Sequence, residues 1–242
     1  MSANYDDGAA LRALLDKQEI AELVRMERFW RDRGDWDRLA AAYVEDAVIR
    51  TTWFEGTPRE FAEASKTLAD AGRHSTHLIT PTSIRLRGDR ALSESLGEIH
   101  HREVLDGVEV DMIQYCRFFS RVQRTDEGWR LASFDGIYGK DLITPVNPAD
   151  SLPFDWSELE GLRPSYRVWA FTLGRRGYEV SQEIPADDRP DLLEPFYRAA
   201  EEWLEGLLTA SAPDDGESAV AAAVVHVNGD HLGRHEAVGQ RH

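Results

Sequence analysis

The sequence lacks most of the residues and motifs on which disulfide, redox and metal chemistry depend. Only one of its 242 residues is a cysteine, so no disulfide can form within the chain. That residue, Cys116, lies in a strand-like run, where we expect it to fill the core. No CxxC, HExxH, GxGxxG or GxxxxGKS/T pattern occurs, so the common signatures of zinc, dinucleotide and phosphate-loop sites are missing. We therefore expect neither a metal ion nor a cofactor.

Long apolar runs and positive charge are also scarce. The chain has 28 basic and 44 acidic residues and a formal net charge of −16, so nucleic acid and anionic membrane surfaces would repel it. No apolar run approaches the length that spans a bilayer, and the N-terminus has no pattern of a secretory signal. With 42% apolar and 30% charged residues, the sequence predicts a folded, cytoplasmic protein without a nucleic-acid or membrane partner.

The first seventy residues have the patterns of three helices and one strand. Apolar side chains recur at spacings of three and four over residues 9–31, which predicts an amphipathic helix that ends at Gly34. Asp35 is placed to cap a short second helix. Residues 47–54 are rich in β-branched and aromatic side chains and predict a strand. The residues TPRE at 57–60 can form a capping box, and they predict a third helix.

A four-stranded meander is predicted from Thr76 onward, with turns at 87–89, 106–107 and 126–128. In the strand that starts at Val108, the even-numbered positions are mostly apolar and are expected to face inward. The same test on the preceding strand turns His101 inward among small side chains. This pattern predicts room for a ligand.

The chain after residue 145 changes character. Prolines at 145, 148 and 153 interrupt regular structure, and two helical patterns follow at about 163–175 and 190–208. We expect residues 146–210 to form a helical extension that either covers a pocket or makes an oligomer contact. Residues 211–242 are rich in Ala, Gly, Asp and His and predict a mobile tail.

Four motifs in this order resemble the SnoaL-like branch of the nuclear transport factor 2-like superfamily. They are DRGDWD at 32–37, VEDAV at 44–48, RHSTHL at 73–78 and EGWRL at 127–131. The resemblance implies an α+β domain at 9–145, a cone-shaped, curved antiparallel sheet wrapped around the N-terminal helices, with a deep apolar pocket. It also implies a homo-oligomer, dimer or trimer, that pairs through the outer face of the sheet. Members include isomerases, dehydratases, dehydrochlorinases, polyketide cyclases and binding modules.

Within this branch the chain looks similar to the scytalone dehydratase and dehydrochlorinase type. That type has an aspartate at the end of the first helix and a histidine on the strand after the third helix, and Asp32 and His77 hold these places. The resemblance therefore implies that His77 is a base and that Asp32 orients it. By spacing alone, Asp32 would cap a helix and His77 would be an ordinary strand histidine.

Further candidates line the implied pocket, each with a structural alternative. Glu27 is either a pocket acid or an exposed helix residue, and His101 either binds substrate or is hydrogen-bonded in the core. Tyr138 can donate to an oxyanion or lie at the pocket mouth, whereas Trp53 and Phe118 form apolar walls or plain core. Relatives of the dehydrochlorinase type carry an arginine where this chain has Phe134, which argues against a halide leaving group.

The sequence thus favours a cofactor-independent lyase that removes water or a small carbonyl fragment from a hydrophobic, aromatic small molecule. Two alternatives stay open. The same base can serve an isomerase or a cyclase, and the cone can be a non-catalytic binding module. A cone interior filled by Trp53, Phe118 and the C-terminal extension would favour the binding module.

Overall fold

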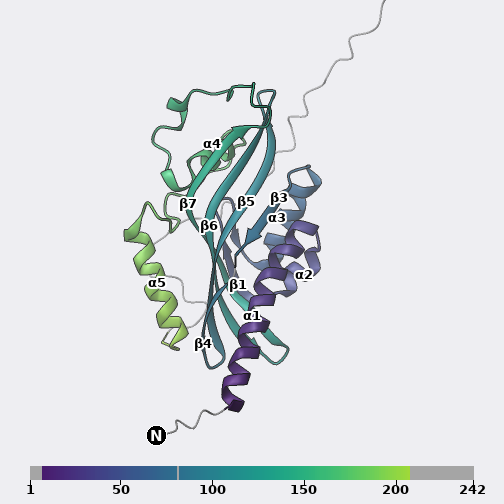
Figure 1. Cartoon of the computed structure of the whole chain (residues 1–242), viewed down its shortest axis with the longest axis vertical. Coiled ribbons are helices and arrows are strands. Elements are labelled where there is room, and N and C mark those ends of the chain that lie inside the picture. The colour runs from purple at the N-terminus through teal and green to yellow at the C-terminus, as the bar shows by residue number, and fades with distance from the viewer. Residues whose placement is uncertain (1–6, 81, 208–242) are drawn as a thin grey trace, which may run out of the picture. The chain divides into compact units, whose positions relative to one another are not determined.

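The computed structural model describes residues 7–80 and 82–207, in which one curved sheet is combined with helices at both ends of the chain (Figure 1). The predicted tail at 211–242 and the last residues of the predicted extension lie outside this part. The α+β prediction is confirmed. The elements in chain order are α1 Asp7–Arg33, α2 Trp36–Ala41, β1 Tyr43–Arg50, β2 Glu55–Gly56, α3 Pro58–Asp70, β3 Ser75–Ile79, β4 Ser83–Arg87, β5 Arg90–Leu105, β6 Val108–Thr125, β7 Gly128–Pro145, the 3-10 turns η1 Trp156–Leu159 and η2 Pro164–Tyr166, α4 Arg167–Gly174 and α5 Pro190–Leu204.

The N-terminal helices begin and end largely where the local sequence predicts. Gly34 adopts a φ of +75°, and the chain leaves α1 there, as is usual for glycine after a helix C-terminus. Thr57 and Glu60 form the predicted capping box at the start of α3. Asp35 differs from the prediction, because its side chain makes no capping hydrogen bond and pairs instead with Arg38 at 3.2 Å.

The seven strands are arranged in the order β2-β1-β7-β6-β5-β3, and β4 pairs with β5 beside β3. The predicted turns separate the long antiparallel strands β5, β6 and β7. The sheet is mixed, because β1 runs parallel to β7, a pair that the antiparallel expectation did not include. Register shifts in β6 at Tyr115/Cys116 and Phe119/Val122 interrupt the ladder, and such bulges bend and twist a strand.

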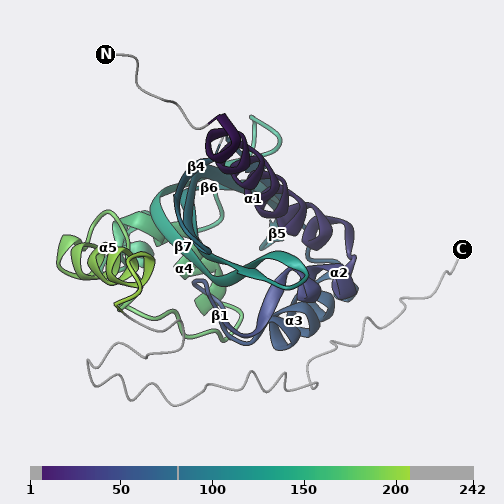
Figure 2. The ribbon, with the colours of Figure 1, turned by 90° about the horizontal axis from the view of Figure 1, so that it is seen from below.

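The concave face of the sheet holds the main core. Figure 2 shows α1, α2 and α3 along one side of the curved sheet. Ile20 and Val24 of α1 and Phe61 of α3 pack there against inward side chains of the strands. Cys116 and Phe118 on β6 are buried in this cluster, as the alternation predicts.

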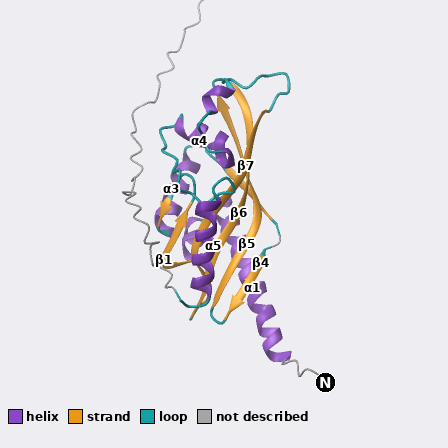
Figure 3. Cartoon of the chain, turned by 90° about the vertical axis from the view of Figure 1, so that its left-hand side faces the viewer, coloured by secondary structure: helices purple, strands orange, loops and turns teal. Residues whose placement is uncertain are grey.

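The C-terminal extension divides between the two faces of the sheet (Figure 3). Val168 and Trp169 of α4 pack with Val110 and Met112, which share the inward positions of β6. Trp203 of α5 packs instead with residues of the outer face. Because α5 covers part of that outer face, it occupies a surface through which a homo-oligomer was expected to pair, and the oligomer stays a prediction.

Helices long and apolar enough to cross a bilayer are not found in the part of the chain that the structure describes.

Candidate active site

Asp32 and His77 meet on the concave side of the sheet although 45 residues separate them. Asp32 lies in the last turn of α1 and His77 in the middle of β3. The Asp32 carboxylate accepts two hydrogen bonds from His77, one from its backbone N–H at 2.7 Å and one from ring Nδ1 at 2.6 Å. A carboxylate can only accept, so the proton of the neutral imidazole lies on Nδ1 and the lone pair on Nε2. The predicted pair therefore exists as a contact, with Nε2 as its free basic atom.

Burial and nearby charges set the protonation of this pair. The His77 side chain is 3% exposed, and burial lowers its pKa to about 4, with Arg31 and Arg28 adding to the effect against the hydrogen bond to Asp32. For Asp32, burial acts to raise the pKa, but the bonds from His77 and the charge of Arg31 outweigh it and lower the pKa. At neutral pH the site thus holds an ionised aspartate and a neutral histidine.

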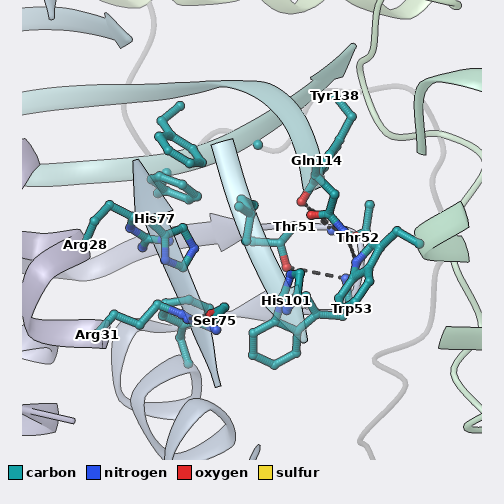
Figure 4. A pocket seen from close by; sticks show the side chains of 16 residues that line it. Arg28, Arg31, Thr51, Thr52, Trp53, Ser75, His77, His101, Gln114 and Tyr138 are labelled. Atoms are coloured by element: carbon teal, nitrogen blue, oxygen red, sulfur yellow. Dashed lines mark hydrogen bonds between the residues drawn. The ribbon is translucent and has the colours of Figure 1, made fainter. Parts of the chain in front are cut away.

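A cavity beside this pair collects residues from distant parts of the chain (Figure 4). Five predicted residues line it, while Asp32 lies behind His77, outside the lining. The lining is completed by mostly polar and aromatic residues from α1, α3 and α4, from the sheet and from the segment between β1 and β2. The predicted lining residues are Trp53, His77, His101, Phe118 and Tyr138, and the others are Arg28, Arg31, Thr51, Thr52, Phe61, Ser75, Ile99, Gln114, Phe134, Gly136 and Trp169.

The open space among these side chains is small, about 30 Å³. That is room for a water molecule and not for a ring. The small side chains predicted to leave room include Gly97, but the Phe118 ring fills the space above it, and a Cβ there would come within 2.2 Å of the ring. A ring-sized ligand therefore requires side chains to move.

The far wall of the cavity is built around His101, whose ring stacks on Trp169 at 4.3 Å between centroids. Burial lowers the pKa of His101 well below its usual value, with further contributions from His77 and Arg31. Its Nε2 is occluded and has no hydrogen-bond partner among the described residues. His101 thus faces the interior as predicted. The alternative, a core histidine whose hydrogen bonds are all made within the protein, is not found, because Nε2 has no partner in the described part of the chain.

A chain of hydrogen bonds links the C-terminal extension to Tyr138. Nε1 of Trp169 donates to Oγ1 of Thr52 at 2.9 Å, and that hydroxyl donates to the Tyr138 oxygen at 3.3 Å. The backbone N–H of Thr52 also donates to this oxygen at 3.3 Å. Burial raises the pKa of Tyr138 to about 12, so the phenol keeps its proton at neutral pH. Because the phenol oxygen already accepts these bonds, its own proton can be donated to a ligand.

Glu27 is placed differently from the expectation. It is buried, but it does not line the cavity and forms a two-pronged ion pair with the neighbouring Arg28. Tyr43 also donates to it at 2.7 Å. Arg28 in turn lies 4.1 Å above the Phe134 ring. The structure therefore places Glu27 as the counter-charge of a buried arginine and not against a substrate.

The lining residues that were not among the predicted ones include Arg28, Arg31, Gln114 and Trp169. The arginines belong to the charged positions of α1, where a helical pattern is typical of a solvated face. Gln114 did carry a signal, because it is a polar residue among the inward, apolar positions of β6, and it is 2% exposed. Trp169 reaches the cavity only because α4 packs against the sheet, and no local sequence pattern predicts that packing.

The model of the SnoaL-like domain matches residues 12–135, just over half of the chain. The chain belongs to the SnoaL-like domain family. The family prediction is therefore confirmed, and the matched segment contains Asp32, His77, His101 and Phe118. Tyr138 and Trp169 lie beyond its end.

Curated fungal proteins match this SnoaL-like chain over a longer stretch. It is 28% identical over 212 residues to an uncharacterized protein of Emericella nidulans, covering 80% of this chain and 87% of that protein. It is 27% identical over 202 residues to pea pathogenicity protein 2 of Fusarium vanettenii, covering 79% and 87%. Because these matches cover more of the chain than residues 12–135, the similarity includes part of the sequence beyond the SnoaL-like domain.

Solved structures show more distant similarity. An NTF2-like protein with a cystatin-like fold from Novosphingobium aromaticivorans is 22% identical, covers 56% of this chain and 90% of its own, and has a TM-score of 0.44. A type 2 hexachlorocyclohexane dehydrochlorinase is 16% identical, with coverage of 60% and 97% and a TM-score of 0.47.

Proposed function

We propose that this SnoaL-like protein is a cofactor-independent lyase that eliminates water or a small carbonyl fragment from a hydrophobic, aromatic small molecule. The observation that carries the proposal is the hydrogen-bonded Asp32–His77 pair, whose buried histidine side chain lines the cavity. The pair is held in one tautomer, with a neutral nitrogen available as a base. That arrangement suits proton abstraction from a carbon acid.

For loss of water, Nε2 of His77 takes the proton from the carbon next to a carbonyl group. The electron pair of that C–H bond forms the new C=C bond, and the C–O bond one carbon further breaks with its electrons. The departing hydroxide takes this proton back from Nε2 of His77 and leaves as water, so His77 returns to its neutral form. In a retro-aldol reaction Nε2 takes the proton of a hydroxyl group on the carbon next to the α-carbon, and the O–H electrons form the C=O bond of the departing aldehyde. The C–C bond breaks with its electrons to give an enolate, and the enolate carbon takes the proton back from His77.

Asp32 stabilises the imidazolium that forms in this step, because its carboxylate keeps the hydrogen bond to Nδ1. Tyr138 donates to the oxygen on which negative charge develops, and the hydrogen bonds from Thr52 hold its phenol in place. Trp53 and Phe118 supply apolar walls for the substrate ring. A positioned base contributes about a hundredfold to ten-thousandfold to the rate.

The extension acts as a lid in this proposal. Trp169 of α4 closes one wall of the cavity and stacks on His101. Trp53, which lies in the irregular segment between β1 and β2, is only half-buried. We expect these two indole rings to move apart when a ring-sized substrate enters.

A second candidate is the non-catalytic binding module, and the small cavity is the observation that favours it. Trp53, Phe118 and the extension occupy much of the interior, as that alternative requires. An isomerase or a cyclase would use the same base but would retain every atom of the substrate.

A panel of aromatic β-hydroxy ketones tests the proposal. Compounds that raise the melting temperature are then assayed for enone formation by absorbance, with wild type, His77→Gln and the control His74→Gln. His74 is exposed, three residues before His77, and suits a matched control. Turnover by wild type and His74→Gln, with loss in His77→Gln, supports the lyase.

Three other outcomes would decide against the proposed lyase. Turnover that survives near the wild-type level in His77→Gln rules out the catalytic role of the pair. Binding without turnover, and without exchange of the carbon-bound proton in D2O, favours the binding module. Exchange or rearrangement without loss of a group favours the isomerase or cyclase.

A further inference from the structure

Arg31 is a buried cation at the cavity that the proposed elimination does not yet use. Its side chain is 12% exposed and lines the cavity together with His77. Burial and the charge of Arg28 lower its pKa to about 10, so it remains protonated at neutral pH. Taking a guanidinium out of water is costly unless its donors and its charge are satisfied.

The guanidinium of Arg31 lies near the rings of Trp53 and Phe61, but its hydrogen-bonding and ionic partners within the protein are few. Nη1 donates to the Ser75 hydroxyl at 2.5 Å and lies 3.7 Å from the Asp32 carboxylate. That carboxylate is already engaged by two shorter hydrogen bonds from His77. Neither Nε nor Nη2 of Arg31 has a hydrogen-bond partner among residues 7–80 and 82–207. Arg31 thus keeps two donors free at the cavity.

Other arginines of the same chain show what this pair of donors usually binds. Arg28, Arg102 and Arg163 each direct Nε and Nη2 to the two oxygens of one carboxylate. The buried Arg163 also donates to two backbone carbonyls. Among these arginines only Arg31 presents this edge without an acid opposite it. The edge matches the spacing of carboxylate oxygens.

We propose that the Nε–Nη2 edge of Arg31 binds a carboxylate on the substrate, so that the substrate class is an aromatic carboxylic acid. The inference rests on the proposed function for the reaction, but the binding it predicts is measurable without turnover. A carboxylate here places the substrate beside His77, whose wall of the cavity Arg31 shares (Figure 4). It also places a negative charge opposite the Nε–Nη2 edge, whereas the ion pair with Asp32 involves Nη1.

The bound carboxylate has a consequence for His77. Arg31 and Arg28 both disfavour its protonation in the free protein, while Asp32 favours it. A negative charge on Arg31 offsets one of the two cations, and it therefore stabilises the imidazolium that forms when His77 accepts a proton. The neighbouring titratable group across the cavity is His101 on β5, which itself stays neutral.

The test uses benzoate and benzamide as probes, because they share a ring and differ in charge. Binding of both to the full chain is measured by calorimetry at one ionic strength. We expect wild type to favour benzoate by about tenfold or more, as charge-assisted hydrogen bonds are roughly twice as strong as neutral ones. Arg31→Gln loses this preference, while Arg31→Lys keeps part of it, because lysine retains the charge but not the fork.

Arg33→Gln is the matched control, since Arg33 is exposed on the same helix and should behave as wild type. Melting curves of each variant establish that it is folded. Equal binding of the two probes by wild type, an unchanged preference in Arg31→Gln, or no binding of benzoate by wild type would each overturn the inference.

His77→Gln separates this inference from the proposed lyase activity. If wild type turns over no tested compound, but both wild type and His77→Gln prefer benzoate to benzamide, the anion site stands and the lyase fails. If turnover depends on His77 but benzamide binds as well as benzoate, the lyase stands and the anion site fails.

Discussion

Replacing Asp32 with asparagine should abolish most activity, because it moves the imidazole proton of His77 from Nδ1 to Nε2. The Asp32 carboxylate accepts from both the backbone N–H and ring Nδ1 of His77, at 2.7 and 2.6 Å. An asparagine offers one oxygen and one NH2 group. With its oxygen on the backbone N–H, the amide NH2 faces Nδ1 and requires a lone pair there. The ring proton then moves to Nε2, and the base at the cavity is lost.

The size of the effect follows from the role of the base. Loss of a general base lowers kcat by about a hundredfold to ten-thousandfold, which corresponds to about 3 to 5 kcal/mol of transition-state stabilisation. The fold should survive, because asparagine has the shape of aspartate. We expect a loss of about 1.5 to 3 kcal/mol in the free energy of unfolding, the contribution of a hydrogen bond to a charged group.

The tautomer can be measured without a substrate. Ring ¹⁵N chemical shifts of His77 should report a proton on Nδ1 in wild type and on Nε2 in Asp32→Asn. Asp35→Asn is the control, because Asp35 is partly exposed and does not contact the cavity. An unchanged tautomer in Asp32→Asn, or turnover within a few-fold of wild type, would refute the reasoning.

Three further predictions concern pH and two buried side chains. Since burial holds the pKa of His77 at about 4, activity should persist well below pH 6.5 and fall only as the pH approaches 4. In the unfolded chain the pKa of this histidine is about 6.5, so protonation favours the unfolded state. The free energy of unfolding, measured with urea, should therefore decrease as the pH falls from about 6.5 to 4. Trp169→Ala removes the ring stacked on His101 and should cost about 3 to 5 kcal/mol of stability and raise KM. Glu27→Gln leaves Arg28 buried without its counter-charge and should cost about 3 to 5 kcal/mol.

Each of these predictions can be contradicted by a specific result. A loss of activity centred near pH 6.5 would show that His77 is not desolvated. An unchanged KM in Trp169→Ala would remove the extension from the site. Glu22→Gln is the control for Glu27→Gln, since Glu22 is exposed on the same helix. Equal stability of these two glutamate variants would contradict the buried ion pair.

Several features of the molecule could be predicted from short stretches of sequence. Spacings of three and four residues predict α1, the TPRE residues predict the capping box of α3, and turn residues separate β5, β6 and β7. These features depend on interactions within a few residues, so a local pattern is sufficient. The inward direction of His101 and Phe118 followed from strand alternation for the same reason.

The Asp32–His77 pair needed the family resemblance in addition, because the two residues are far apart in the chain and each has an ordinary structural role by itself. The resemblance supplied their order and place in a known fold. It could not supply the hydrogen bonds, which require α1 to lie against β3.

Only the tertiary structure shows which arginines of α1 are buried and which are exposed. The sequence does not distinguish Arg28 and Arg31 from the exposed arginines of the same helix. The curved sheet buries these two, gives Arg28 a partner in Glu27, and leaves the Nε–Nη2 edge of Arg31 at the cavity. Trp169 likewise reaches Thr52 across 117 residues through the packing of α4. The sequence by itself determined most of the elements and, through the family resemblance, the candidate base. Burial depends on how distant elements pack, and it decided which charges face the cavity.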